Sequence, residues 1–153
     1  MKARPYSAWI SRLFIAVMTM LACTGMLQMP LAKRYYLTEV PGMAWTGDFF
    51  IVHKLHYVFA ALLLFLVGVV VVNWFMKWRD RLTFTPLGIA RVAILAGIIM
   101  SGGFRVYRNL PDVTLDPWIV VSIEWVHFGL TMIMGGVALI ALIRKCSAYA
   151  KES

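Results

Sequence analysis

Long apolar stretches separated by short polar connections dominate the hydrophobic pattern of the chain. A helix needs roughly 20 mainly apolar residues to cross a bilayer, and four stretches are about that long or longer. We therefore expect membrane-spanning helices at residues 13–32, 49–76, 86–104 and 117–143. The sequence shows no internal repeat or linker. The pattern thus predicts an all-α fold in which residues 1–153 form one transmembrane four-helix bundle.

The composition supports a membrane protein and argues against several other classes. Hydrophobic residues make up 61% of the 153 residues and charged residues 14%, and the mean hydropathy is +0.78. Soluble domains carry about 25% charged residues, so a soluble enzyme, a disordered chain and a nucleic-acid-binding protein are all disfavoured. The two cysteines, Cys23 and Cys146, lie too far apart to indicate a disulfide framework or a metal-binding motif.

The net charge of +8 is explained by membrane topology. With four spans, ten of the 15 Lys and Arg residues fall on the side of the N-terminus and five on the other side. Cytoplasmic segments are enriched in such cations, so both termini are expected in the cytoplasm. The basic N-terminus and the Leu21-Ala22-Cys23 segment resemble a signal peptide. The apolar stretch is longer than a signal core of about 7–15 residues, so we expect it to be retained.

All three histidines of the chain lie within or at the edge of predicted spans. His53 and His56 are three residues apart and therefore share a face of the second helix. At 1.5 Å per residue, His53 lies about 6 Å, His56 about 10 Å and His127 about 15 Å below the outer surface. Ionisable groups at such depths are costly and are usually functional. Two helices thus bring imidazoles to similar depths in the outer half of the bilayer.

Two imidazoles that face each other across a helix bundle suit the two axial positions of a haem iron. We expect His127 and His56 to be the ligands, with His53 as the alternative to His56. His53 could instead contact lipid headgroups, a haem propionate or a quinone. His56 and His127 could be structural hydrogen-bonding residues, and the three histidines could also hold zinc or copper. No other span contains a histidine, so the sequence predicts one haem.

Other residues could complete a haem site near the outer surface. Arg105 and Arg108 directly follow the third span, where guanidinium groups could pair with the propionates, although both could also be solvated loop cations. Glu124 lies one turn from His127 and could orient a ligand, relay a proton or reach the interface. Small residues would leave space for a haem or simply allow close helix packing: Gly97, Gly102, Gly103, Gly129, Gly135 and Gly136.

Three segments resemble the small four-helix cytochrome b subunits of bacterial respiratory oxidoreductases, such as formate dehydrogenases, nickel-iron hydrogenases and thiosulfate reductases. They are Phe-Ile-Val-His-Lys-Leu-His-Tyr at residues 50–57, Glu-Trp-Val-His-Phe-Gly at 124–129 and Arg-Val-Tyr-Arg-Asn-Leu-Pro at 105–111. The resemblance implies an outer haem b held by histidines of the second and fourth helices. Family members often bind a second haem through a first-helix histidine, which this sequence lacks.

The expected function is electron transfer between the quinone pool and a periplasmic redox partner. The partner would be a multihaem cytochrome c or an iron–sulfur subunit, and the chain would be one subunit of a hetero-oligomeric complex in the bacterial inner membrane. A quinone would need hydrogen-bonding groups, for which the candidates are Lys54, Tyr57, Glu124 and Trp125. The alternatives are a haem-free membrane anchor whose histidines bind quinone or serve packing, and a small metal or proton carrier.

Overall fold

The computed structural model describes residues 8–29, 31–144 and 148–152. In chain order, the elements are α1 (Ala8–Leu27), α2 (Leu31–Arg34), the 3-10 helices η1 (Leu37–Glu39) and η2 (Ala44–Gly47), α3 (Phe49–Asn73), the π-helical turn η3 (Trp74–Trp78), β1 (Leu82–Phe84), α4 (Pro86–Tyr107), α5 (Pro117–Ile143) and β2 (Ala150–Glu152). The expected position of the termini depends on residues 1–7 and 153, which lie outside the described part, as does Cys146.

Four helices in the described part of the chain are long and apolar enough to cross a membrane, as the hydrophobic pattern predicts. They are α1, α3 together with η3, α4 and α5. The fourth helix has the predicted bounds, and the second and third begin at the predicted residues. The predominantly helical fold with four helices that could cross a membrane is therefore confirmed.

The starts of three spanning helices are fixed by capping side chains. Asp48 accepts hydrogen bonds from the backbone N–H groups of Phe50 and Ile51. Thr85 accepts one from Gly88, and Asp116 accepts one from Trp118. Helices α4 and α5 also begin with a proline at the first helical position, where the missing N–H costs nothing. Such caps satisfy donors that the first turn leaves unpaired.

The first span differs from the prediction at both ends. It was expected at residues 13–32, whereas α1 runs from Ala8 to Leu27. The helix includes Arg12 because a spanning helix can extend beyond the hydrocarbon layer, where a charge is solvated. It ends early because Pro30 disfavours helical geometry at the residue before it.

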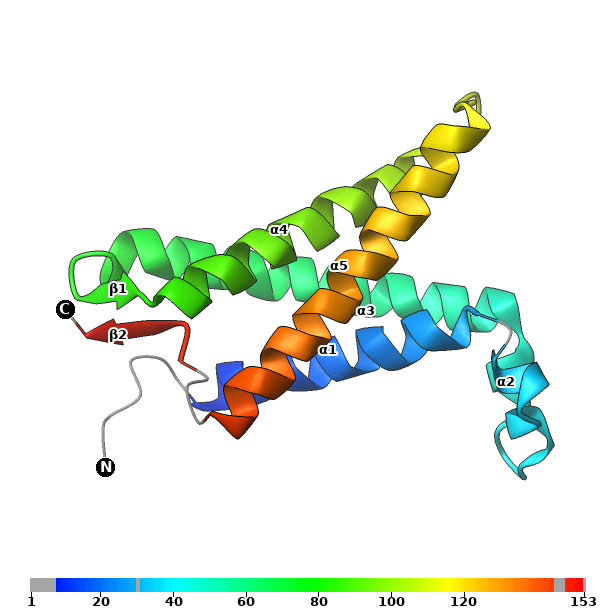
Figure 1. Cartoon of the computed structure of the whole chain (residues 1–153), viewed down its shortest axis with the longest axis horizontal. Helices are drawn as coiled ribbons and strands as arrows, with labels where there is room; N and C mark the ends of the chain where they lie inside the picture. Colours follow the sequence, from blue (N-terminus) through cyan, green and yellow to red (C-terminus); the bar gives the residue numbers. More distant parts are fainter. Residues whose placement is uncertain (1–7, 30, 145–147, 153) are drawn as a thin grey trace. The chain divides into compact units, whose positions relative to one another are not determined.

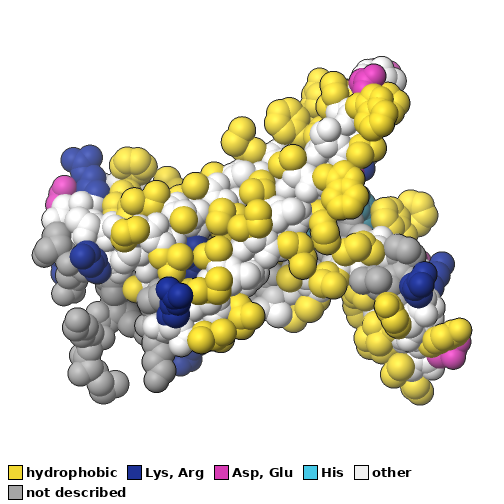
Figure 2. Space-filling model, viewed as in Figure 1, with side chains coloured by type: hydrophobic (Ala, Val, Ile, Leu, Met, Phe, Trp, Pro, Cys, Tyr) yellow, Lys and Arg dark blue, Asp and Glu magenta, His cyan; other side chains and the backbone are white. Residues whose placement is uncertain are grey.

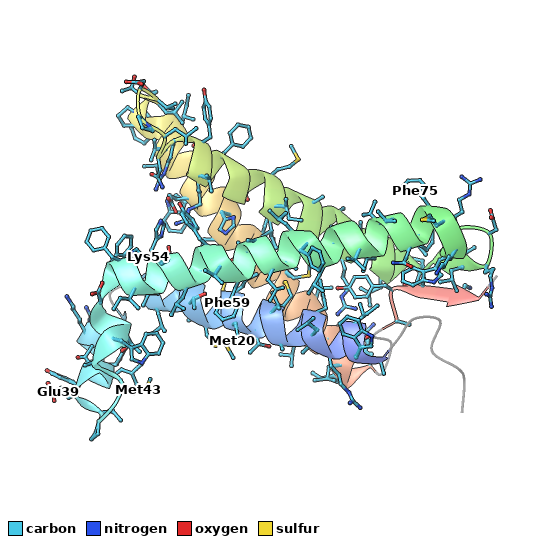
Figure 3. The ribbon with its side chains drawn as sticks, turned by 180° about the vertical axis from the view of Figure 1, so that it is seen from behind. Met20, Glu39, Met43, Lys54, Phe59 and Phe75 are labelled. Atoms are coloured by element: carbon cyan, nitrogen blue, oxygen red, sulfur yellow. The ribbon has the colours of Figure 1, made fainter. Side chains whose placement is uncertain are left out.

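The chain divides into two compact units, Met1–Arg81 and Leu82–Ser153. In the first unit, α1 and α3 run side by side in opposite directions, and α2, η1 and η2 form the connection between them (Figure 1). Figure 3 shows Glu39 and Met43 in this connection and Lys54 near the start of α3. Whether residues 1–153 behave as one domain stays a prediction.

The second unit consists of the antiparallel helices α4 and α5 and a small sheet (Figure 1). Strands β1 and β2 pair antiparallel, with Thr83 opposite Lys151. The N–H of Thr85 also donates to the carbonyl of Tyr149 at 3.0 Å, and the Arg91 guanidinium lies 4.5 Å from the centre of the Tyr149 ring. This sheet is an addition to the predicted all-α fold.

The outward faces of the long helices are apolar. Phe65 of α3 is 66% exposed and Leu142 of α5 is 70% exposed, and many other large apolar side chains are similarly open. Figure 2 shows hydrophobic side chains spread over the helices, with Lys and Arg side chains gathered in only a few places. Exposed apolar surface on this scale marks an interaction with membrane or protein, which agrees with the multi-pass assignment.

Candidate functional site

The first candidate ligand, His56, lies on the face of α3 that packs against α1. Its Nδ1 is 2.9 Å from the hydroxyl oxygen of Thr24. The Thr24 hydroxyl also donates to the carbonyl of Met20, four residues earlier in α1, at 2.7 Å. A Cβ atom added to Gly25 would lie 3.4 Å from Cε1 of His56. The imidazole thus rests against a threonine and the glycine that follows it.

His127 of α5 has the same surroundings in the second unit. Its Nδ1 is 3.0 Å from the hydroxyl oxygen of Ser101 in α4. The Ser101 hydroxyl donates to the carbonyl of Gly97, again four residues earlier, at 2.8 Å. A Cβ atom on Gly102 would lie 3.3 Å from Cε1 of His127. Both units therefore contain a hydroxyl residue, a following glycine and an imidazole on the antiparallel neighbouring helix.

The hydroxyl residues Thr24 and Ser101 are buried, at 5% and 6% exposure, and were not identified from the sequence. The sequence contains only a weak indication of these two residues. Each is a small hydroxyl residue followed by glycine in the C-terminal half of a span, but Ser and Thr are common at helix–helix contacts in membranes. Gly102 was among the candidate glycines, and the structure places it directly beside His127.

His53 has a different environment, although it also faces α1. Its Nδ1 lies 3.2 Å from Oε1 of Gln28, one turn beyond Thr24. Its ring stacks on Phe49 at a centroid distance of 5.3 Å and lies 4.3 Å from the ring of Tyr57. The amide Nε2 of Gln28 is buried and has no hydrogen-bond partner among the described residues. Nothing in the sequence pattern singles out Gln28.

Arg105 and Arg108 converge on one carboxylate, that of Glu124. The Nε of Arg105 lies 3.1 Å from Oε2 of Glu124, and Nη2 of Arg108 forms an ion pair with Oε1. The three side chains are only partly exposed. Two guanidinium groups and one carboxylate leave a net positive charge at this end of the unit. Their pairing with haem propionates stays a prediction.

The four quinone candidates are divided between the two units, with Lys54 and Tyr57 in the first and Glu124 and Trp125 in the second. Lys54 is exposed near the start of α3 (Figure 3), and Tyr57 contacts the ring of His53. Glu124 is committed to the two arginines. Trp125 is 68% exposed and packs edge-on against Phe128. A quinone site formed by these residues stays a prediction.

The remaining candidate glycines have different surroundings. A Cβ atom on Gly97 would meet Cδ1 of Leu130 at 2.9 Å, which is the end of a flexible side chain. No atom of the described residues is found within 4 Å of a Cβ atom added to the other four: Gly103, Gly129, Gly135 and Gly136. The described part of the chain contains no group of three or more His, Cys, Asp or Glu side chains placed to hold a metal ion.

The chemistry of the donor set fits haem iron. A ligating histidine almost always engages its second ring nitrogen in a hydrogen bond, which fixes the ring orientation. In His56 and His127 the Nδ1 atoms are engaged in this way, and Nε2 is the nitrogen suited to an iron. Comparison with known proteins found no matching family model, curated protein or solved structure.

Proposed function

We propose that this protein is a membrane cytochrome b subunit with one bis-histidine haem b. His56 and His127 are the proposed axial ligands, and the electrons pass between the quinone pool and a periplasmic redox partner. The proposal combines the similar depths of the two histidines in their spans with the local geometry in each unit. Its setting is the bacterial inner membrane.

The observation that carries the proposal is the matched environment of His56 and His127. The two Nδ1–hydroxyl distances are 2.9 and 3.0 Å, and the glycine contacts are 3.4 and 3.3 Å. Two ligands of one iron share the requirement for a hydrogen bond at the second ring nitrogen, and this arrangement meets that requirement at both histidines. The described partner of the His53 Nδ1 atom is an amide group and not a hydroxyl group. This favours His56 over His53 as the ligand.

When bound, the haem supplies a one-electron redox centre. The chain's own residues hold and orient it. Thr24 and Ser101 orient the two imidazoles, and the apolar helices keep water away from them. The positive cluster of Arg105, Arg108 and Glu124 would attract a propionate, because the two cations exceed the one carboxylate.

The partner of this subunit would dock on the outer side of the membrane. The connections between α1 and α3 and between α4 and α5 are too short to form a substrate site of their own. The chain therefore needs a separate protein to deliver or accept electrons, and we propose a multihaem cytochrome c or an iron–sulfur subunit. The quinone would exchange electrons near the same side.

A haem-free membrane anchor is the second candidate, and one observation favours it. Each histidine has a polar partner within its own unit, which is also what a purely structural role requires. An anchor would show no Soret absorption, and it would tolerate His127→Ala.

The decisive test is a reduced-minus-oxidised absorption spectrum of the full chain purified in detergent, with haem quantified per chain. We expect about one haem b per chain, in keeping with one pair of axial ligands. His56→Ala and His127→Ala should each abolish the signal, and His53→Ala should keep it as the matched control. A folded protein without haem would support the anchor. Loss in His53→Ala with retention in His56→Ala would move the ligand one turn outward.

A further inference from the structure

We infer that Thr24 and Ser101 are positioning residues that fix the tautomer of His56 and His127, so that each imidazole carries its proton on Nδ1 and presents a bare Nε2. The argument rests on how many protons each hydroxyl group has. A hydroxyl group has one proton to donate and lone pairs that accept. The assignment of the tautomer stands on the geometry alone, whereas its use in binding iron rests on the proposed function.

In each unit the hydroxyl group already donates its proton to a backbone carbonyl of its own helix. The Thr24 oxygen is 2.7 Å from the Met20 carbonyl, and the Ser101 oxygen is 2.8 Å from the Gly97 carbonyl. A carbonyl oxygen can only accept, so at such distances the hydroxyl proton must lie between the two oxygens. If the hydroxyl proton pointed to the imidazole instead, the lone pairs of the hydroxyl oxygen would face those of the carbonyl oxygen across this short distance, which is repulsive.

The hydroxyl oxygen can then only accept from the imidazole. At 2.9 and 3.0 Å, the Nδ1 atoms of His56 and His127 must carry the proton that completes these bonds. A neutral imidazole has one N–H, so Nε2 is left with a lone pair. This is the protonation state that an axial ligand needs, and it is set before any metal arrives.

His53 provides a contrast within the same unit. Its partner Gln28 is an amide, which can accept through its oxygen or donate through its nitrogen. This contact therefore does not select one tautomer. A hydroxyl group with a committed proton does select one, and the described contacts place such a group at His56 and at His127.

The direct test is nitrogen NMR of the full chain in detergent, labelled with ¹⁵N-histidine and prepared without haem. Bare and protonated ring nitrogens differ in chemical shift, and the signals are assigned with the three His→Ala variants. We expect protonated Nδ1 and bare Nε2 at His56 and His127. Thr24→Val should change the tautomer of His56 alone, and Ser101→Ala that of His127 alone.

Two hydroxyl residues serve as matched controls. Thr19 of α1 makes the same bond to the carbonyl four residues earlier, and Ser122 of α5 does so too, but neither contacts a histidine in these bonds. Thr19→Val and Ser122→Ala should leave all histidine signals unchanged. Thr24→Ser and Ser101→Thr should preserve the tautomers because they keep the hydroxyl group. A protonated Nε2 in the unaltered protein, or a Thr24→Val variant with the original tautomer, would overturn the inference.

The second readout separates the inference from the proposed function. Titration of haem into the same proteins should show about 10- to 100-fold weaker binding in Thr24→Val and Ser101→Ala, as expected for partners of a metal ligand. The reduction potential should also rise, because an imidazole without this bond donates less charge to ferric iron. Correct tautomers without haem binding would contradict the proposed function alone. Normal haem affinity and potential in both variants would contradict the positioning role alone.

Discussion

The glycines beside the two proposed ligands set how closely α1 approaches His56 and α4 approaches His127. A Cβ atom at Gly102 would lie 3.3 Å from the ring of His127, whereas one at the adjacent Gly103 would have nothing within 4 Å. Two neighbouring glycines of one helix thus differ in their surroundings: Gly102 faces the imidazole, whereas Gly103 is exposed. This contrast allows the positioning of the ring to be tested without altering any polar group.

We predict that Gly102→Ala weakens haem binding and that Gly103→Ala does not. The added methyl group must push the imidazole or the helix away, and overpacking of this kind costs about 1–3 kcal/mol. Gly103→Ala should instead stabilise α4 by about 0.5–1 kcal/mol, because alanine is the better helix former. Haem titration and thermal unfolding of the two variants measure both effects. Equal haem affinity in the two variants would show that Gly102 does not position the ring.

The polar partners of the histidines could not be predicted from the spacing of residues along one helix. The sequence places His53 and His56 on one face of α3, and the expected span bounds predict a similar depth for His127. The pairing of Thr24 with His56, or of Ser101 with His127, depends on how two helices are rotated against each other. A single sequence carries little information about that rotation.

At the scale of the element, the Arg105–Arg108–Glu124 cluster ties the last turns of α4 to the first turns of α5. Its members come from both helices, and one carboxylate serves two cations. Removing the carboxylate would leave two guanidinium groups close together with no partner in the cluster. Removing one arginine would leave a simple ion pair.

We therefore predict that Glu124→Gln destabilises the protein more than Arg108→Gln does. Partly exposed ion pairs contribute only about 0.2–1 kcal/mol each, so the difference should be of this order. A double-mutant cycle between the two positions, followed by thermal unfolding in detergent at low salt, gives the coupling energy. Addition of salt should reduce it, because screening weakens such pairs. A coupling of zero would mean that the cluster does not link α4 to α5.

The starts of the three capped helices could be predicted from local sequence signals. Asp48, Thr85 and Asp116 are capping residues, and the helices that they cap begin where the apolar pattern predicts. The small sheet was not predicted, because strands of three residues have no recognisable period. Its partners are also more than 60 residues apart in the sequence. Only the folded unit brings them together.

The sheet leads to a prediction about the C-terminal segment. A Cβ atom at Gly88 would collide with the backbone carbonyl of Tyr149. Gly88→Ala should therefore detach residues 148–152 from the start of α4 and leave the helices in place. Hydrogen exchange should become faster at Thr85, whose N–H donates to Tyr149. Gly68→Ala is the control, since nothing lies within 4 Å of its added Cβ atom. Unchanged exchange at Thr85 in Gly88→Ala would contradict the prediction.

At the scale of the whole molecule, the proposed function depends on the orientation of the chain in the membrane. The histidines lie nearer to the ends of α3 and α5 that follow the connections 28–48 and 108–116. The distribution of Lys and Arg predicts that these connections face the periplasm. If they do, a haem held by His56 and His127 is within reach of a periplasmic partner.

This orientation can be measured by cysteine labelling of the full chain after Cys23 and Cys146 have been replaced by alanine. We expect a membrane-impermeant maleimide to label Glu39→Cys and Leu110→Cys in intact cells, and to label Arg79→Cys only after the membrane is opened. All three positions are exposed, so access depends on the side of the membrane alone. The reverse pattern would place the histidines near the cytoplasm and would exclude a periplasmic electron partner. Labelling of Glu39→Cys and Leu110→Cys from opposite sides would contradict the four-span topology itself, because an even number of spans separates them.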